Sequence, residues 1–221
     1  MSRRGLVVPT RFRIPAALWA LFLLQTAIVA LWPRFFLDIL VDDVVADLRA
    51  SWEPVLPGLR GAAGLVGRLG AREVLAPLVV LTCLVTGWRR RSLVLPARLF
   101  GTYLLVGAVT GVVKVGLARP QPLPFPGVAG RAFPSGHAAQ AVVVFGTLAL
   151  LAAAGRTPAW RRRACAVAGG VVGLVIIALL WRQAHWLTDM VGGVTLGLAA
   201  LTTGRAVVRR SPERTPVACR E

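Results

Sequence analysis

Six long apolar runs dominate the pattern of hydrophobic and polar positions along the 221-residue chain. They cover residues 14–32, 74–88, 93–116, 135–154, 164–180 and 186–204, and only residues 181–185 separate the last two. A helix needs about 17–25 apolar residues to span a bilayer, and open sheet cannot satisfy its backbone polar groups within lipid. The pattern therefore predicts an all-α, polytopic membrane bundle with six transmembrane helices.

Residues 34–71 form the longest segment between these runs, and their pattern predicts an amphipathic helix. The segment holds five of the nine acidic residues, and apolar positions recur between them near helical spacing. Such a helix is typical of a membrane surface, either as a plain connector over the bundle or as a lid that guides substrate. We expect a cytoplasmic segment at 1–13, a membrane domain at 14–204 that includes this external connector, and a cytoplasmic tail at 205–221.

Composition and charge support a membrane protein. Hydrophobic residues make up 56% of the chain and the mean hydropathy is +0.69, which is too apolar for an ordinary soluble domain. A net charge of +17 also suits a nucleic-acid-binding protein, but the arginines are spread over the loops beside the apolar runs. We therefore expect membrane lipids, and no nucleic acid, as partners.

The positions of the arginines predict the orientation of the bundle. Seventeen of the 26 basic residues lie on one side of it: Arg3, Arg4, Arg11, Arg13, Arg89, Arg90, Arg91, Arg98, Arg156, Arg161, Arg162, Arg163, Arg205, Arg209, Arg210, Arg214 and Arg220. The positive-inside rule makes this side cytoplasmic. Both termini then lie inside, and the segments around residues 119, 137 and 185 lie outside.

The rarest ionisable residues of the chain lie in short polar clusters beside the apolar runs. Lys114 is the only lysine, and His137 and His185 are the only histidines, in a chain with 25 arginines. Ionisable groups near membrane depth are costly and usually functional. These three residues therefore indicate a site.

The tetrapeptide Pro-Ser-Gly-His at 134–137 predicts an anion site at the start of a helix. Ser135 is a suitable N-cap, and the next amides point out of the positive end of the helix. Gly136 lets an oxyanion approach the backbone, and His137 lies within reach of the bound group. A capped helix with an interfacial histidine is the structural alternative.

Two further pairs carry candidate chemistry. His185 and Asp189 are four residues apart, so on a helix the carboxylate can hold one ring nitrogen and raise the basicity of the other. Lys114 and Arg119 can clamp phosphate oxygens. A structural polar pair and interfacial cations that snorkel to headgroups explain the same residues.

Together these clusters resemble the type 2 phosphatidic acid phosphatase (PAP2) superfamily, which also contains vanadium haloperoxidases. The family pattern is Lys-x6-Arg-Pro, then Pro-Ser-Gly-His, then Ser-Arg-x5-His-x3-Asp, and the resemblance covers roughly residues 70–205. It implies that His185 is a nucleophile that forms a phosphohistidine, that Asp189 orients it, and that His137 is the general acid. It also implies that Lys114, Ser135 and the Gly136 amide hold phosphate oxygens.

Both arginines of the family pattern are missing from their columns. Gln121 and Leu179 stand in their place, and Ala178 replaces the serine. Arg119 lies two residues before Gln121, and we expect Arg182 to lie one helical turn after Leu179 and one turn before His185. Our hypothesis is that Arg119 and Arg182 substitute for the missing pair, and a decayed, non-catalytic site is the alternative.

The function implied by the resemblance is hydrolysis of a lipid phosphate or diphosphate at the outer membrane face. Plausible substrates are polyprenyl diphosphate, phosphatidate and phosphatidylglycerol phosphate. A phosphotransferase that uses an acceptor alcohol, and a non-catalytic lipid-phosphate binder, are the alternatives. We expect no cofactor and no metal, because the clusters contain no group of carboxylates for magnesium. Nothing in the sequence indicates the oligomeric state.

Overall fold

A computed structural model describes residues 9–123 and 131–208, and these residues form eight α-helices and no strand. The helices are α1 (Thr10–Leu31), α2 (Phe36–Trp52), α3 (Leu59–Arg68), α4 (Arg72–Arg90), α5 (Val94–Leu117), α6 (Gly136–Ala152), α7 (Pro158–Trp181) and α8 (Leu187–Val208). The all-α prediction is confirmed. Each apolar run corresponds to one helix, α1 or one of α4 to α8, and the ends of the run and of the helix differ by a few residues.

Five helical segments are long and apolar enough to cross a membrane: residues 10–31, 59–90, 94–117, 158–181 and 187–207. The sixth predicted span, α6, is apolar but only 17 residues long. The chain is therefore a multi-pass membrane protein, while the number of six spans stays a prediction. α8 continues four residues beyond the predicted end at 204, and most of the predicted tail lies outside the described residues.

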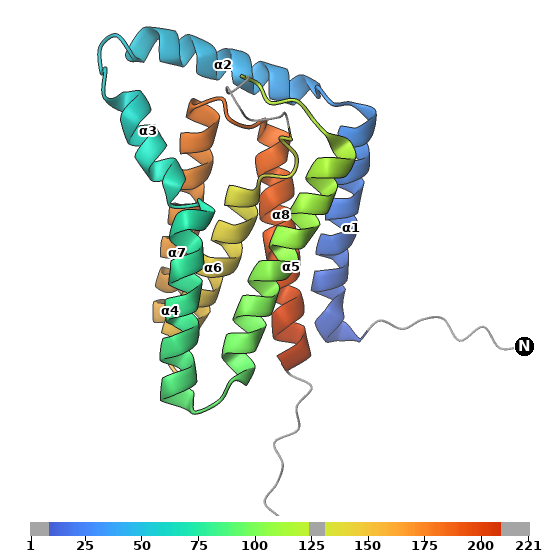
Figure 1. The fold of residues 1–221 in the computed structure, drawn as a ribbon, viewed down its shortest axis with the longest axis vertical. Coiled ribbons are helices and arrows are strands. Elements are labelled where there is room, and N and C mark those ends of the chain that lie inside the picture. Colours follow the sequence, from blue (N-terminus) through green and yellow to red (C-terminus); the bar gives the residue numbers. More distant parts are fainter. Residues whose placement is uncertain (1–8, 124–130, 209–221) are drawn as a thin grey trace, which may run out of the picture.

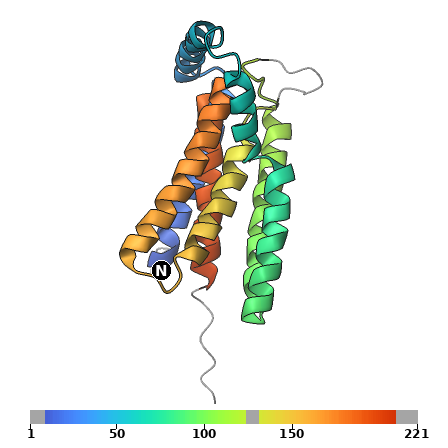
Figure 2. The same cartoon turned by 90° about the vertical axis from the view of Figure 1, so that its left-hand side faces the viewer.

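The long helices run side by side, and α2 lies across one end of the bundle (Figure 1). We call this the α2 end. α6 packs against both α7 and α8, and α1 packs against α8. Figure 2 shows α4 and α5 as a pair on one side of α6. Thr10 and the end of α8 lie at the opposite end of the bundle from α2.

α2 faces the bundle with Asp38 and with part of its apolar surface, Val41 and Val45, while other apolar residues form an exposed flank. Asp38 is 1% exposed, whereas Phe36, Leu40 and Val44 are 66%, 56% and 50% exposed. At its other end, Arg49 donates a 2.5 Å hydrogen bond to the side chain of Gln183, beyond α7. An exposed apolar flank suits the predicted amphipathic connector on a membrane surface. Its position outside the membrane stays a prediction.

Glycines bring α6 and α8 into close backbone contact. A Cβ atom added at Gly193 would lie 2.5 Å from the Ser135 carbonyl oxygen, and one at Gly197 would lie 2.7 Å from that of Ala139. Both distances are shorter than real Cβ contacts, so these positions exclude any side chain. The contact sets the first turn of α6, which carries His137, beside the first turns of α8, which carry Asp189 and directly follow His185.

Candidate functional site

Four of the eight predicted site residues line a cavity of about 820 Å³ between α4, α5 and α6 at the α2 end of the bundle. Lys114 reaches it from the last turn of α5, Gly136 and His137 from the first turn of α6, and His185 from the turn before α8. The ring centroids of the two histidines are 6.4 Å apart, with an angle of 66° between the rings. At this separation both rings can contact one bound phosphoryl group.

The predicted pairing of His185 and Asp189 is confirmed, but not the helix expected to carry both. α8 begins at Leu187, so His185 lies in the preceding turn, and its Nδ1 is 3.3 Å from Asp189 Oδ2. The same Oδ2 accepts a 2.9 Å hydrogen bond from the backbone N–H of Trp186, as in a capping box. Because a carboxylate only accepts, this contact selects the neutral tautomer that has its proton on Nδ1 and a free lone pair on Nε2.

The start of α6 agrees with the predicted cap. Ser135 is the N-cap of α6, and its Oγ accepts a hydrogen bond from the Ala138 N–H at 3.4 Å. Its own N–H donates to the Asp189 carbonyl at 3.0 Å, which joins the start of α6 to α8. Ser135 is fully buried and is not among the residues that line the cavity, whereas Gly136 is. Phosphate binding by Ser135 therefore stays a prediction.

Lys114 is held at the cavity by two backbone carbonyls. Its Nζ donates to the carbonyl oxygens of Arg131 and Ala132, the latter at 3.0 Å. An ammonium group has three N–H donors, so one N–H remains for a ligand in the cavity. This geometry suits a cation that is oriented before a phosphate arrives.

Arg119 lies behind the dyad rather than in the cavity. α5 ends at Leu117, and Ala118 adopts a positive φ of 44°, which turns the chain. The guanidinium of Arg119 is 1% exposed and forms ion pairs with Asp38 and Asp189. It is not among the residues that line the cavity, so this geometry gives no support to a phosphate clamp at Arg119.

Arg182 is also not among the residues that line this cavity. The assumption that the helix continues through it is wrong, because α7 ends at Trp181 and Gln183 reverses the chain with a φ of 50°. Arg182 lines a separate pocket of about 470 Å³, together with Arg60 and Arg68 of α3. Arg182 keeps its helical spacing from Leu179, because its N–H still donates to the Ala178 carbonyl, but the predicted helical spacing from Arg182 to His185 does not exist.

Sequence reasoning missed several polar groups of the cavity wall. Tyr103 and Thr110 share the Lys114 face of α5, and Gln121 follows it. Among the described residues, Tyr103 Oη, Thr110 Oγ1 and Gln121 Oε1 are buried without a hydrogen-bond partner. Buried polar groups usually have partners, so these atoms indicate a space that a polar ligand or water fills. The spacing from Lys114 along α5 was the available signal.

Further cations line the mouth of this cavity. Arg72 of α4 and Arg131, which precedes α6, are both exposed, and Glu73 beside Arg72 is the carboxylate among the lining residues. Together with Lys114 they make the cavity positively charged. Neither arginine belongs to a motif quoted from the sequence, so only the fold brings them to the site.

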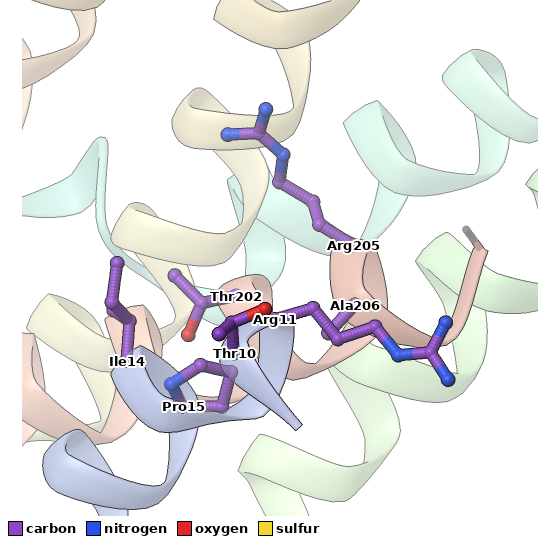
Figure 3. Close-up of a pocket in the computed structure, with 7 residues that line it drawn as sticks. All are labelled: Thr10, Arg11, Ile14, Pro15, Thr202, Arg205 and Ala206. Atoms are coloured by element: carbon purple, nitrogen blue, oxygen red, sulfur yellow. The ribbon is translucent and has the colours of Figure 1, made fainter. Parts of the chain in front are cut away.

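A second pocket has a different chemical lining. It measures about 380 Å³ and lies between the first turns of α1 and the last turns of α8, at the opposite end of the bundle (Figure 3). Its charged lining residues are Arg11 and Arg205, and its other lining residues are Thr10, Ile14, Pro15, Thr202 and Ala206. It lacks the histidine and carboxylate groups of the larger cavity.

Comparison with known proteins connects the fold with a family. The family model of the PAP2 superfamily matches residues 95–213, a segment that includes Lys114, His137, His185 and Asp189. Among solved structures, the crystal structure of the first transmembrane PAP2-type phosphatidylglycerolphosphate phosphatase from Bacillus subtilis aligns with a TM-score of 0.76. The identity is 21%, over 91% of this chain and 98% of that chain. No curated protein matches the chain.

Proposed function

Because the chain belongs to the PAP2 superfamily, we propose that it hydrolyses a lipid phosphate or diphosphate at the cavity between α4, α5 and α6. One observation carries the proposal. Two histidines line one cavity beside a lysine, and Asp189 holds the Nδ1 side of His185 while Nε2 keeps its lone pair. This is the arrangement of an oriented nucleophile beside a second acid–base group.

The proposed reaction has two steps. In the first, Nε2 of His185 attacks phosphorus in line, the bond from phosphorus to the leaving oxygen breaks, and His137 donates a proton to that oxygen. In the second, His137 removes a proton from water, the water oxygen bonds to phosphorus, and the phosphorus–nitrogen bond breaks. Phosphate leaves, and both histidines return to their starting states.

The developing charge on the phosphoryl oxygens is stabilised by groups oriented before the reaction. Lys114 supplies the third donor of its ammonium, and the N-terminus of α6 supplies its amides and the positive end of the helix dipole. Removal of one charge-assisted hydrogen bond of this kind costs about 1.5–3 kcal/mol, or roughly 10- to 100-fold in rate. We keep the prediction that no metal and no cofactor take part, and test it with a chelator.

Lipids are the proposed substrate class because the cavity lies among apolar helices. Polyprenyl diphosphate, phosphatidate and phosphatidylglycerol phosphate are the candidates, and the solved relative is described as a phosphatidylglycerolphosphate phosphatase. We further propose that the α2 end faces the exterior of the cell, as the arginine distribution predicts.

The test is phosphate release by purified protein in detergent from a panel of these lipids. Wild type should release phosphate with or without a chelator, and His185→Ala should release none and trap no acid-labile phosphate. Arg162→Ala, at an exposed position near the start of α7 and far from the cavity, is the matched control. Absence of release from every lipid would favour a non-catalytic binder. Transfer to an added alcohol in preference to water would favour a phosphotransferase.

A further inference from the structure

We propose that Arg119 and Asp38 are positioning residues, which hold Asp189 and thereby orient His185. This inference rests on the proposed function and assigns roles beyond the family motifs. It replaces the hypothesis that Arg119 clamps phosphate. It also gives α2, which the sequence presents as a connector, a direct connection to the catalytic dyad.

Arg119 lies between two carboxylates from different parts of the chain. Its Nη2 is 2.6 Å from Asp38 Oδ2 of α2, and its Nη1 donates to Asp189 Oδ1 of α8. All three side chains are at most 1% exposed. Oδ2 of Asp189 accepts hydrogen bonds from His185 Nδ1 and from the Trp186 amide. Arg119 binds the other oxygen, Oδ1, and so restrains rotation of the carboxylate.

The guanidinium has little capacity left for a substrate. Its Nε donates to the Pro33 carbonyl at 2.8 Å, and Nη1 also donates to Thr188 Oγ1 at 2.8 Å. With the two carboxylates, four of its five N–H donors are used. The group also lies over the ring of Trp186, 5.7 Å from the ring centroid. A phosphate would have to displace buried ion pairs in order to bind Arg119.

Asp38 also fixes the first turn of α8. Its Oδ1 accepts from the Thr188 N–H and its Oδ2 from the Thr188 hydroxyl, both at 2.8 Å. Thr188 is the second residue of α8 and directly precedes Asp189. Asp38 therefore satisfies an amide that the helix itself leaves without a partner and meets Arg119 with its other oxygen. Arg119 thus binds the Asp189 side chain, while Asp38 binds the backbone directly before it.

The charges of the network suit this role. Asp38 and Asp189 together carry one negative charge more than Arg119 neutralises, and the excess faces His185. A buried charge without a partner is strongly destabilising, so Arg119 lets two carboxylates lie close together behind one histidine. The remaining charge is available to stabilise His185 when the ring becomes positive on phosphorylation.

The decisive experiment separates turnover from phosphate binding. Arg119→Met and Asp38→Asn should each lower kcat roughly 10- to 100-fold, the effect of losing one charge-assisted hydrogen bond. KM and the inhibition constant of vanadate, a phosphate mimic, should change by less than about threefold because neither residue touches phosphate. Arg119→Lys should recover part of the loss, since lysine keeps the charge but lacks the planar fork. The combined variant should lose much less than the product of the two single effects.

Two controls make the result specific. Arg49→Met removes a different polar contact of α2, to Gln183, and should leave kcat within about twofold of wild type. An equal fall in Arg49→Met would mean that any loosening of α2 slows turnover, and would overturn the roles of Arg119 and Asp38. If Arg119→Met does not fold, by thermal unfolding and gel filtration, Arg119→Lys and Asp38→Asn decide the question.

The clamp hypothesis predicts a different outcome. In that case vanadate affinity should fall with kcat/KM in Arg119→Ala, and the added substitution Gln121→Arg, which restores the family column at a cavity-lining position, should recover both. Such a recovery, or wild-type kcat in Arg119→Met, would overturn our inference while leaving the phosphatase proposal intact. Absence of phosphate release by wild type would instead overturn the proposed function.

Discussion

Lys114 presents one free donor of its ammonium group to the cavity, because two carbonyls occupy the others. We expect Lys114→Met to lower kcat/KM roughly 10- to 100-fold, since a hydrogen bond to a charged group contributes about 1.5–3 kcal/mol and each tenfold change in rate is about 1.4 kcal/mol. Arg98→Met, at the opposite end of α5, is the control and should match wild type. Equal kinetics for Lys114→Met and wild type would remove Lys114 from the site.

The sequence anticipated this cavity at single residues that are chemically rare. The chain has one lysine and two histidines, whereas arginine supplies its other basic residues, and all three of these side chains line the same cavity. Asp38 carries no such signal, because aspartate is common in its segment. It lies 81 positions from Arg119, and no local periodicity marks a contact over that distance.

At the scale of helices, apolar length predicted the long helices, but the ends depend on backbone turns that composition does not reveal. Ala118 and Gln183 both adopt positive φ, a conformation that is uncommon outside glycine and is not visible from residue type. The first turn carries Arg119 behind Asp189, and the second separates Arg182 from His185. The positions of Arg119 and Arg182 away from the cavity lining both arise at these two turns.

The cavity-lining face of α5 can be tested by filling it. Gly111 lines the cavity, and a Cβ atom added there would meet nothing within 4 Å. Gly111→Leu should therefore fold normally and raise KM at least severalfold, because the side chain projects into the space for substrate. Gly101→Leu, an open position on the same helix outside the cavity, is the control. The midpoint of thermal unfolding should be unchanged or slightly higher in both variants, since leucine has a higher helix propensity than glycine.

At the contact between α6 and α8, by contrast, we expect a larger side chain to destabilise the protein. In Gly193→Ala the new methyl group would meet the Ser135 carbonyl at 2.5 Å, so the two helices must separate. Overpacking of this kind costs about 1–3 kcal/mol, and we expect a lower midpoint of thermal unfolding together with a lower kcat. Gly173→Ala in α7, with open space around it, should not destabilise. A fully stable Gly193→Ala variant would mean that this contact is looser than described.

For the whole molecule, the decisive property is which side of the membrane the α2 end faces. In a background of Cys83→Ala, Cys165→Ser and Cys219→Ser, we expect Gly58→Cys, between α2 and α3, to react with a membrane-impermeant maleimide on intact cells. Arg161→Cys, near the start of α7 at the opposite end, should react only after permeabilisation. The reverse pattern would move the proposed chemistry to the cytoplasmic face.

The buried contact between Asp38 and Arg119 has a consequence for the history of the family. Loss of Arg119 would leave Asp38 and Asp189 buried without their shared cation, so a lineage that loses Arg119 should also lose or replace Asp38. In an alignment of relatives, the columns of residues 38 and 119 should then vary together, although they lie in different helical segments. Members that keep the family arginine in the column of Gln121 offer the contrast, because they show whether an arginine in the column of residue 119 accompanies an aspartate in the column of residue 38 there as well. If residues 38 and 119 vary together only in relatives that lack the family arginine in the column of Gln121, the contact between α2 and the dyad arose together with the loss of that arginine.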